Sequence, residues 1–410
     1  MIAPRVSVII VSHGRPNHLN GVVKSLLQQR FPSFEIIIVA EPEALSSAQF
    51  DVGVIKTVAF SHANISAARN LGIAHAAGEI IAFIDDDARP EPLWLSRLVG
   101  PIASGAASAA TGRVIGRNGI TNQSTCVSVA PNADERTLPF GSKARVFRGE
   151  CIKLVGTNCA FDAKFLRRLG GFDEGYAFYM DDTDVSMRAR NDGASIAYVG
   201  DAVVHHGFAA GPLRRQDRVP TSLTKIGQST ARFLSSHCGA RERGYAVEKQ
   251  TLLQRNRLIQ LMIDGLIDPI QVRLLLKQYQ AGIEMETKRT PKAPELDLRR
   301  PFRPVSVQIG RDKVLASRFW NRRRVRAVAR QSALAGDIVT VIRLSWTALF
   351  HTAKYLDDEG YWVQRGGLFG RSERGDPIFR IWRFRGRVER EIKRISSDRF
   401  SSIMPDIEPK

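Results

Sequence analysis

The sequence predicts an α/β fold in which a mostly parallel sheet is flanked by helices, and three observations lead to this prediction. Residues 5–39 read as a strand, a helix and a second strand, which together make one βαβ unit. The run 80–84 is short and apolar, as in strands buried on both faces of a parallel sheet. Three aspartates, residues 85–87, follow that run. Because ligands of open α/β sheets bind beyond the carboxyl ends of the strands, we expect a ligand site there.

The first βαβ unit has the clearest local pattern. β-Branched residues dominate 5–11 and 34–39, which indicates two buried strands. Between them, leucines and valines recur at helical spacing over 17–29, and Asn17 is a suitable N-cap. Units of this kind are right-handed, so this one is expected to start a doubly wound sheet.

The elements that follow bring the chain to the aspartates and beyond them. A third strand is predicted at 52–58, and a helix of small residues at 64–78 with Gly78 as its C-cap. Residues 100–150 predict loops and short strands. The later elements that we expect are a strand at 156–161, a short helix at 163–169, a helix over 178–190, and strands at 196–199 and 202–204.

The three adjacent aspartates predict a cation site. Neighbouring carboxylates repel one another, and only a cation or a set of hydrogen-bond donors relieves that cost. Hard divalent ions with oxygen ligands, Mg²⁺ or Mn²⁺, suit such a site and typically bridge it to a phosphate. The alternative is a solvated acidic turn that merely ends the strand.

Charge divides the chain into two halves. Its 410 residues carry a formal net charge of +19, and 43% of them are hydrophobic, which is enough for globular cores. Residues 1–214 hold 21 Lys and Arg against 20 Asp and Glu, so almost all of the excess lies in 215–410. We expect a near-neutral domain at 1–215, a helical extension at 216–290 and a basic region at 291–410 that contacts an anionic partner.

The basic half suggests helices and a surface for an anionic partner. Apolar residues at helical spacing over 246–283 predict two helices broken near Asp268, and 287–304 reads as a surface connector. Arginines alternate with aromatic residues at 317–326 and 379–388. This pattern suits an anionic membrane surface. It also suits nucleic acid, but no nucleic-acid-binding motif is present, and two solvated basic helices packed on the catalytic domain are a further alternative.

Compartment is inferred from what the sequence lacks. Four cysteines are too few and too scattered for a disulfide framework or a zinc site. The chain begins without a charged leader and apolar run, and the apolar stretch 338–350 is short for a membrane span and contains Arg343. A cytoplasmic protein, peripheral on the inner face of the cell membrane, is therefore expected.

Six motifs in order resemble the family-2 glycosyltransferases, whose fold is called GT-A. The resemblance covers about Val6 to Gly207. Its motifs are Val-Ser-Val-Ile-Ile-Val-Ser-His-Gly-Arg-Pro at 6–16, Ser-Ala-Ala-Arg-Asn-Leu-Gly at 66–72, Ile-Asp-Asp-Asp at 84–87, Gly-Thr-Asn-Cys-Ala-Phe at 156–161, Gly-Gly-Phe-Asp-Glu at 170–174 and Asp-Asp-Thr-Asp at 181–184. The fold it implies is a Rossmann-like, mostly parallel sheet flanked by helices, here with a mainly helical basic C-terminal extension.

The resemblance implies a donor site at the ends of the first strands. Ser12 and His13 would face the nucleotide base and Arg69 would lie near it. Asp85 would hold the ribose or the metal, and Asp87 would ligate the metal directly.

Two further donor residues follow from the same motifs. Asp86 would belong to the substrate-binding set together with its neighbours in the Asp-x-Asp motif. Where the family usually has an aspartate pair after the second strand, this chain has Glu41, which would contact the base in its place.

The resemblance also implies an acceptor side and a lid. Asn158 would lie near the donor sugar, unless it only satisfies backbone groups within a packed strand. The family places its general base in the 181–184 motif, commonly as the second acid, which is Asp182 here. Helix capping is the alternative for Asp181, which is otherwise assigned to substrate binding.

Metal binding and closure complete the implied site. A histidine after the last strand often joins the metal shell, and we favour His206 over His205, with a structural role for both as the alternative. Residues 208–218, with Arg214, resemble the mobile loop that closes over the donor diphosphate.

The sequence thus predicts an inverting, metal-dependent glycosyltransferase of bacterial surface polysaccharide biosynthesis. Mn²⁺ or Mg²⁺ would be its cofactor, a nucleotide-diphosphate sugar its donor, and a glycan or lipid-linked glycan its acceptor; nucleic acid is not expected as a partner. The alternatives are a catalytically silent nucleotide-sugar or glycan-binding module, and a nucleotidyltransferase of the same layout.

Overall fold

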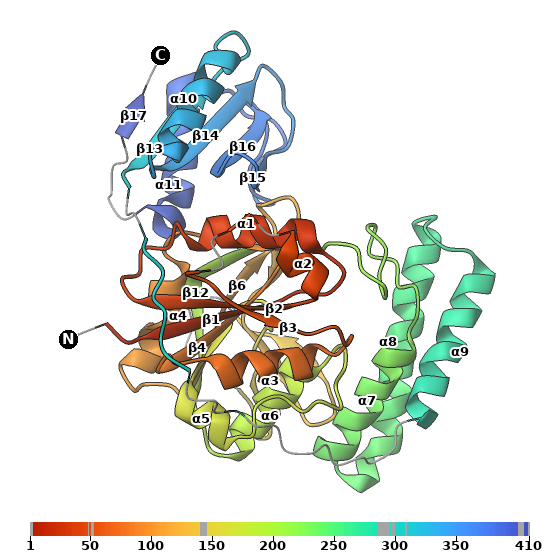
Figure 1. The fold of residues 1–410 in the computed structure, drawn as a ribbon. Helices are drawn as coiled ribbons and strands as arrows, with labels where there is room; N and C mark the ends of the chain where they lie inside the picture. Colours follow the sequence, from red (N-terminus) through yellow and green to blue (C-terminus); the bar gives the residue numbers. More distant parts are fainter. Residues whose placement is uncertain are drawn as a thin grey trace.

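The computed structural model describes residues 3–47, 49–50, 53–139, 146–285, 296, 300–307, 310–400 and 406–408. Figure 1 shows three parts: a sheet covered by helices, a helical extension beside it, and a smaller α/β unit at the top of the view. The termini belong to different parts, since the chain starts at the first sheet and ends in the smaller unit.

The first half of the large sheet is parallel, as predicted. Its strands are β1 (Val6–Val11), β2 (Phe34–Ala40), β3 (Lys56–Ala59) and β4 (Ile80–Asp85). They lie in the order β3-β2-β1-β4, and Val11 pairs in register with Val39 on one side and with Asp85 on the other. The carboxyl ends of these strands therefore share one edge of the sheet, where the aspartates follow β4.

The second half of the sheet is mixed. It contains β5 (Ala88–Pro90), β6 (Ala109–Ile115), β7 (Asn122–Ser124), β11 (Cys159–Asp162) and β12 (Ile196–His206), and the order continues from β4 as β11-β6-β12-β5. β11 runs antiparallel to β4, and β5 antiparallel to β12. Three short strands, β8 (Val127–Val129), β9 (Glu135–Thr137) and β10 (Cys151–Ile152), form a separate small sheet. This curled, mixed arrangement agrees with the expected GT-A layout.

Helices cover both faces of the sheet (Figure 1). One face packs against α1 (Pro16–Leu26) and α4 (Trp94–Ala103), and the other against α3 (Ile65–His75), α5 (Ala163–Arg168) and α6 (Asp181–Asn191); α2 (Pro42–Ser46) is short. Val8 of β1 belongs to the first core and its neighbour Ile9 to the second, because successive strand side chains point to opposite faces. Both faces of β1 are thus buried, which explains its unbroken apolar run.

Two predicted helix ends were wrong. The first helix begins at Pro16 with Arg15 at the N-cap position, so Asn17 is not its cap. Helix α3 ends at His75 with Ala76 as its C-cap, so Gly78 is not the C-cap. Gly78 has another role, because a Cβ there would lie 2.5 Å from the backbone nitrogen of Ser7. The missing side chain lets the chain enter β4 directly alongside β1.

Three helices follow the large sheet in the segment predicted as a helical extension. They are α7 (Thr224–His237), α8 (Ala240–Ile263) and α9 (Pro269–Met285), and the break between the last two falls at Asp268, as expected. Leu223, Leu258 and Tyr279 are buried between these helices. Gly227 and Gly282 allow α7 and α9 to pack closely, since a Cβ on either would meet a backbone oxygen of the other segment at 2.1–2.2 Å.

Beyond residue 311 the chain forms a second α/β unit that the sequence reading did not foresee. Its elements are β13 (Asp312–Ser317), α10 (Arg322–Leu334), β14 (Ile338–Ser345), β15 (Thr352–Leu356), β16 (Tyr361–Gly367), α11 (Phe384–Arg399) and β17 (Asp406–Glu408), with the sheet order β15-β16-β14-β13-β17. β13, β14, β16 and β17 are parallel. The apolar stretch at 338–350 is therefore mainly a buried strand, and helices still outweigh strands in the C-terminal half.

The second α/β unit is fixed to the large sheet by two ion pairs, one buried and one partly exposed. Arg399 donates two hydrogen bonds, of 2.6 and 2.8 Å, to the carboxylate of Glu91, which lies just after β5. Arg89 forms a second bidentate pair with Asp357, with both bonds at 2.7 Å. The ring of Trp362 lies 4.2 Å from the Arg399 guanidinium carbon. These contacts hold the second unit directly against the large sheet.

Four further sequence predictions concern the connector, the cysteines, membrane-spanning helices and the domain boundaries. The connector at 287–304 lies largely outside the described residues. All four cysteines are buried and free. None of the described helices has the length and apolar content that crossing a membrane requires. The domain boundaries at 215 and 290 stay predictions.

Candidate active site

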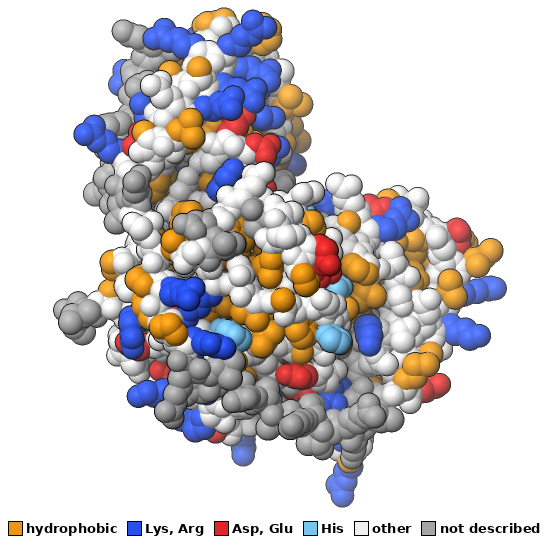
Figure 2. All heavy atoms as spheres, in the orientation of Figure 1, with side chains coloured by type: hydrophobic (Ala, Val, Ile, Leu, Met, Phe, Trp, Pro, Cys, Tyr) orange, Lys and Arg blue, Asp and Glu red, His pale blue; other side chains and the backbone are white. Residues whose placement is uncertain are grey.

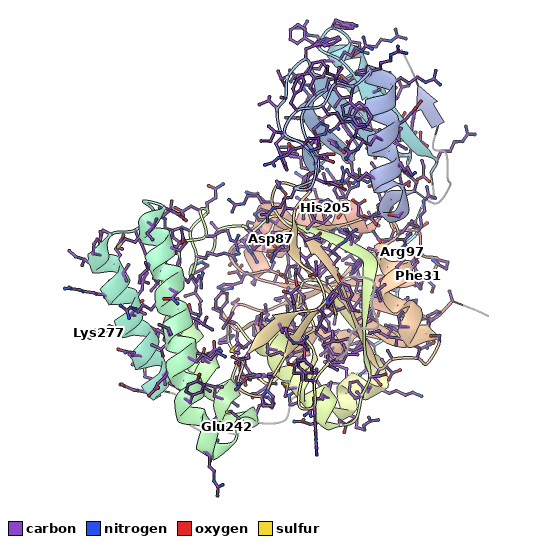
Figure 3. The ribbon with its side chains drawn as sticks, turned by 180° about the vertical axis from the view of Figure 1, so that it is seen from behind. Phe31, Asp87, Arg97, His205, Glu242 and Lys277 are labelled. Atoms are coloured by element: carbon purple, nitrogen blue, oxygen red, sulfur yellow. The ribbon has the colours of Figure 1, made fainter. Side chains whose placement is uncertain are left out.

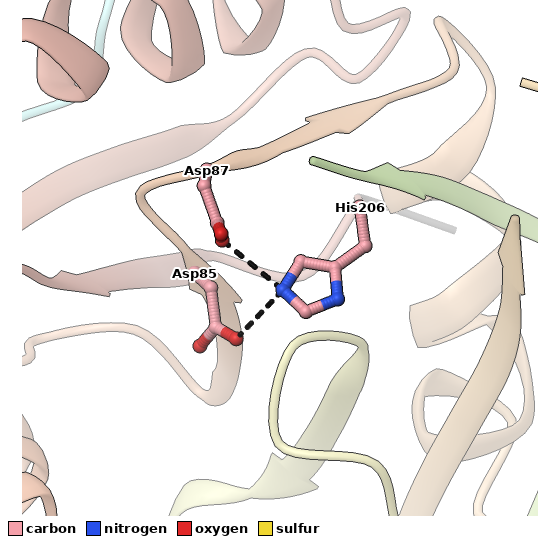
Figure 4. Close-up of side chains that lie close together, drawn as sticks. All are labelled: Asp85, Asp87 and His206. Atoms are coloured by element: carbon pink, nitrogen blue, oxygen red, sulfur yellow. Dashed lines mark ion pairs between the residues drawn. The ribbon is translucent and has the colours of Figure 1, made fainter. Parts of the chain in front are cut away.

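Asp85, Asp87 and His206 form a compact cluster at the carboxyl edge of β4. Asp85 ends that strand, and Asp87 lies in the turn to β5. His206 pairs in register with Ala88, because β12 runs antiparallel to β5, and this brings its ring beside Asp87. His206 Nε2 lies 3.1 Å from Asp87 Oδ1 and 3.7 Å from Asp85 Oδ2 (Figure 4).

The cluster fits a divalent metal ion. One ligand atom from each residue lies within 4.8 Å of the others. Ligands that share one Mg²⁺ or Mn²⁺ at about 2.1 Å are at most roughly 4 Å apart, so small side-chain rotations suffice. Asp87 Oδ1 is buried, and the only described group that pairs with it is His206 Nε2, which would be its fellow ligand. Imidazole and carboxylate are a common donor set for such ions.

Asp87 and His206 shift each other's pKa in opposite directions. Burial alone would raise the pKa of Asp87, but His206 and Arg15 outweigh it and hold that pKa well below its usual range. Burial likewise would lower the pKa of His206, while its contact with Asp87 raises it. Because a ligating imidazole must be neutral, a metal ion bound here would replace the proton that Asp87 otherwise favours on His206.

Asp86 points away from this cluster into the protein. Its carboxylate accepts a 2.6 Å hydrogen bond from Ser12 Oγ and lies 2.8 Å from an Arg15 nitrogen. Burial, together with the charge of Asp87, raises its pKa to about 7 in spite of Arg15. The structure therefore uses Ser12 and Asp86 to support the turn, whereas the sequence placed both against the substrate.

Arg69 lies beneath the site, between two carboxylates. It forms a short ion pair with Asp181 and a longer one, of 3.5 Å, with Asp85. The guanidinium is buried, and its carbon lies 5.1 Å from the ring centre of Phe172. Gly156 makes room for it, since a Cβ there would lie 2.6 Å from Arg69 Nη2. Arg69 thus ties the strand that carries Asp85 to the helix that carries Asp181.

Asp181 and Asp182 have different surroundings although they are adjacent. Asp181 is buried, and burial raises its pKa to about 6 against the pull of Arg69. Asp182 is partly exposed and accepts hydrogen bonds from the Gly156 amide at 3.0 Å and the Thr183 hydroxyl at 3.2 Å. Only Asp182 therefore keeps part of its carboxylate free for a substrate.

The chain is strained just before these acids. Tyr179 and Met180 have φ angles of 72° and 65°, so two consecutive residues other than glycine adopt the left-handed conformation at the start of α6. Phe208, two residues after His206, has a φ of 54°. Such conformations cost about 1–3 kcal/mol each and cluster at ligand sites. Their position on both sides of the cluster marks the same region as the carboxylates do.

The loop after β1 is held by Glu41. His13 Nδ1 lies 2.9 Å from one oxygen of Glu41, and the Gly14 amide donates a 2.6 Å hydrogen bond to the other. His13 and Glu41 both keep exposed surface at the edge of the sheet. The predicted nucleotide-base residues are thus brought together, and Glu41 orders the loop as well.

Asn158 is fully occupied by structural hydrogen bonds. Its side-chain oxygen accepts from the Trp94 indole at 2.8 Å, and its nitrogen donates to the carbonyls of Arg113 and Ala202, both at 2.9 Å. The side chain is completely buried. This fits the structural alternative, in which Asn158 satisfies backbone groups between β6 and β12.

The last predicted residues lie at the end of β12. His205 contacts Glu91 at 2.8 Å, so it faces the second α/β unit, and His206 alone of the two joins the metal cluster. The Ala209 amide donates a 2.6 Å hydrogen bond to Asp87. Arg214 is half-buried and stacks near Phe208, 5.5 Å from the ring centre. The 208–218 loop therefore lies over the cluster, as predicted for a closing loop.

A cleft of about 660 Å³ opens beside the cluster. Asp87, His206 and Arg15 line one side, and Lys354 and Tyr355 of β15 line the other. Seen from behind, Asp87 and His205 lie at the junction between the large sheet and the second unit (Figure 3). The C-terminal half thus contributes directly to the walls of the site.

Two charged residues of the site escaped sequence reasoning. Arg15 contacts both Asp86 and Asp87, and the only signal for it was its position in the loop after β1. Lys153 pairs with Glu135, and although burial lowers its pKa, the charges of Asp182 and Glu135 raise it. Its proximity to Asp182 comes from a loop fold that no local pattern predicts.

The comparison with protein families identifies the part of the chain that carries this site. A model described as "Glycosyl transferase family 2" matches residues 7–170, which include β1 and the three aspartates. The chain contains a family 2 glycosyltransferase domain. This confirms the expected family, and the transferase domain supplies every ligand of the metal cluster except His206, which lies beyond the matched residues.

Curated relatives and a solved structure are similar to parts of the chain. An O-antigen biosynthesis protein, RfbC, of Myxococcus xanthus is 26% identical over 53% of this chain and 18% of its own length. A glucosyl-dolichyl phosphate glucuronosyltransferase of Haloferax volcanii is 28% identical over 41% of this chain and 56% of its own. The crystal structure of GalNAc-T7 with UDP, GalNAc and Mn²⁺ matches at 16% identity and a TM-score of 0.40, covering 56% of this chain and 48% of the other. The chain thus spans little more than half, or less, of the length of these relatives.

Proposed function

We propose that the chain transfers a sugar from a nucleotide-diphosphate donor to a hydroxyl of a glycan or lipid-linked glycan, with inversion at the anomeric carbon. The observation that carries this proposal is the Asp85–Asp87–His206 cluster in a family 2 domain, linked through Arg69 to the acids that start α6. Mn²⁺ or Mg²⁺ bound there would stabilise the departing diphosphate as a Lewis acid.

The protein's own residues supply the other steps. His13 and Glu41 are exposed where the nucleoside would lie, and the 208–218 loop reaches Asp87 through Ala209 and can cover the diphosphate. Asp182 is the residue that takes the proton from the acceptor hydroxyl. Its neighbour Asp181 is engaged by Arg69, whereas Asp182 is oriented by the Gly156 amide and remains partly exposed. One base and one displacement invert the centre without a covalent intermediate.

The relatives support the class of acceptor. One is named for O-antigen biosynthesis, and another for transfer of glucuronic acid to a glucosyl-dolichyl phosphate. We therefore propose surface polysaccharide or lipid-linked glycan as the acceptor class in this protein. Residence in the cytoplasm, peripheral on the inner face of the membrane, stays a prediction.

The test is a screen of nucleotide sugars with the full chain. UDP-, GDP- and dTDP-sugars are incubated with Mn²⁺ and a pool of glycan acceptors, and released nucleoside diphosphate is measured. We expect one donor to turn over, and Asp182→Asn to bind it with unchanged affinity and turn it over at least about 10²-fold more slowly. The surface variant Asp192→Asn serves as the control. Donor binding without turnover, equal in all three proteins, would contradict transfer and favour a silent binding module.

A further inference from the structure

The second α/β unit exposes a cluster of large apolar side chains on three loops. Phe319 and Trp320 follow β13, Trp346 and Leu349 follow β14, and Ile378, Phe379 and Ile381 belong to the segment between β16 and α11. These residues are 57–82% exposed. We call this set of seven side chains the tip surface. Soluble proteins rarely leave so many large apolar groups exposed on one end of a small unit unless something covers them.

The topology explains why these loops converge. β13, β14 and β16 are parallel, with Ser317 paired to Arg343 and Ser345 to Gly367, so their carboxyl ends share one edge. Ring contacts join the loops, since Phe369 lies 6.0 Å from Trp346 and 5.6 Å from Phe379. The tip surface is therefore one surface rather than scattered exposed residues.

This edge points away from the transferase domain. The opposite edge of the same sheet makes the contacts with that domain: Asp312, at the start of β13, pairs with Arg30, and the Gly360 carbonyl, just before β16, accepts from Gln28. The carboxyl ends of β13 and β14 lie one strand length, about 20 Å, from these contacts. The edge strand β15 also reaches the transferase domain, where the Ala353 amide donates to the Asn118 carbonyl. Its occupant is thus not the sugar donor bound at the metal cluster.

Arginines without carboxylate partners surround the tip surface. Arg343 of β14 lies directly opposite Arg365 of β16, and burial together with the charges of Arg322 and Arg365 lowers the pKa of Arg343. None of these three forms an ion pair with a described residue. Like charges paired across strands destabilise a sheet unless an anion neutralises them. Figure 2 shows Lys and Arg mixed with hydrophobic side chains over the end of this unit, with little acidic surface beside them.

The combination of groups selects the occupant. Indole and phenyl rings prefer the boundary between water and lipid, and arginines there bind lipid phosphates. Nucleic acid would use the rings and arginines, but it has no use for the exposed aliphatic groups of Leu349, Ile378 and Ile381. We propose that the tip surface inserts into the headgroup region of an anionic bilayer, and that Arg322, Arg343 and Arg365 bind its phosphates.

The surface differs from what the two basic segments alone suggested. Arg326, on the same helix as Arg322, is paired with Glu359 and faces away from the tip. Trp346 and Leu349 were in neither segment, yet they complete the apolar part. The transferase domain contributes nothing to this surface, so docking and sugar transfer can fail independently.

The test is sedimentation of the full chain with vesicles of phosphatidylcholine, with and without phosphatidylglycerol. We expect binding only to the anionic vesicles. Trp320→Ser/Trp346→Ser/Phe379→Ser should weaken it at least about tenfold, since the apolar groups that enter the bilayer are lost. Tyr245→Ser/Leu334→Ser, which changes exposed groups of α8 and of the opposite end of α10, should bind like the parent. Equal binding by the triple variant overturns the proposal.

A second pair of variants tests the arginines. Arg322→Ser/Arg343→Ser/Arg365→Ser should weaken binding about a hundredfold, because each arginine near an anionic surface contributes roughly fivefold. Arg241→Ser/Arg255→Ser/Arg273→Ser removes the same charge from exposed positions of α8 and α9 and should bind like the parent. Equal losses of vesicle binding in both variants would show that binding depends on net charge alone, and would overturn the assigned surface.

Two further readouts separate the other occupants. Brominated lipids should quench the fluorescence of Trp320 and Trp346 in the parent. Binding of single-stranded RNA in place of vesicles, or a dimer in light scattering that the aromatic triple variant dissolves, would overturn the proposal in favour of nucleic acid or of a second copy. Turnover of the nucleotide sugar with a soluble acceptor should be unchanged in the aromatic triple variant. If the parent protein shows no turnover, the proposed function is contradicted, but the proposed membrane surface is not.

Discussion

Buried carboxylates at the edge of the first sheet and in the second α/β unit have opposite surroundings. At the first edge, Asp85, Asp86 and Asp87 crowd together with Arg15 and a histidine, and the pKa of Asp86 rises to about 7. In the second unit, Glu391 of α11 is also fully buried, but Arg387, Arg390 and Arg394 all contact it.

The difference separates a binding site from a structural centre. Burial raises the pKa of any carboxyl, but around Glu391 the arginines and Gln364 outweigh it and lower the pKa to about 2. At the first edge the pKa of Asp86 stays raised in spite of Arg15, and a bound divalent cation would supply further positive charge. The centre around Glu391 finds its partners within the chain, so its role is to stabilise the second unit.

The largest effect is expected from removing a ligand of the incomplete cluster. Asp87→Asn should abolish metal-dependent donor binding and slow transfer by about 10⁴-fold, because Lewis-acid stabilisation is worth several kcal/mol. Calorimetry with nucleoside diphosphate and Mn²⁺ measures the binding. Asp201→Asn, an exposed acid on β12, is the matched control. Unchanged binding by Asp87→Asn would remove Asp87 from the ligand set.

Substitutions of the two adjacent acids of α6 should affect different quantities, kcat in one case and the free energy of unfolding in the other. Asp182→Asn should lower kcat by about 10³-fold and leave the free energy of unfolding nearly unchanged, since it removes only the proton acceptor. Asp181→Asn should instead cost about 3 kcal/mol of stability, because Arg69 keeps a buried charge without its closest partner. Steady-state kinetics and urea unfolding of both variants measure the split. A larger loss of kcat in Asp181→Asn would move the role of base to Asp181.

The ion pairs of Glu391 should make the free energy of unfolding depend on pH. The pKa of Glu391 is lowered from 4.5 to about 2, so its contribution to stability is complete above about pH 4.5 and is lost as the pH falls towards 2. Glu391→Gln should therefore lose about 3 kcal/mol at pH 7 and little at pH 2. Urea unfolding at several pH values, followed by tryptophan fluorescence, gives both numbers. A variant whose deficit is the same at every pH would show that the charge of Glu391 is not what stabilises the unit.

The smallest effect concerns the junction between the two regions. A Cβ on Gly21 of α1 would lie 2.1 Å from Arg89 Nη2 and 2.5 Å from Asp357, so Gly21→Ala should disturb that ion pair and cost about 1 kcal/mol. Gly244→Ala in α8 has open space around it and should stabilise by up to about 1 kcal/mol through helix propensity. Thermal unfolding of the two variants tests the sign. If both variants are stabilised, the Arg89–Asp357 ion pair can shift to accept a Cβ on Gly21 without a loss of stability.

Much of the transferase domain follows from sequence patterns because its signals are local. The apolar runs of β1, β2 and β4 need only their own residues to be recognised, and the order strand, helix, strand leaves few topologies. The motif around Asp85 and Asp87 could be predicted as a metal site for the same reason. The helix break at Asp268 is similarly determined by the proline that follows it.

Tertiary structure decided which of the neighbouring residues act. His206 joins the cluster and His205 does not, because the pairing of β12 with β5 turns the first towards Asp87 and the second towards Glu91. Asp86 turns inward to Ser12, while Asp85 and Asp87 face His206. Alternation along a strand or turn is visible in the sequence, but its phase is set by partners far away in the chain.

The second sheet and the tip surface were likewise beyond local patterns. The run 338–345 fits a buried strand or a short helix equally well, and only pairing with β13 and β16 settles it. Phe319, Trp346 and Phe379 lie in separate loops, and these loops share one edge of the sheet because parallel strands end there together. The sequence by itself determined the transferase family, the three aspartates and the basic charge of the C-terminal half. Long-range strand pairing decided where that charge gathers and which acids remain free to act.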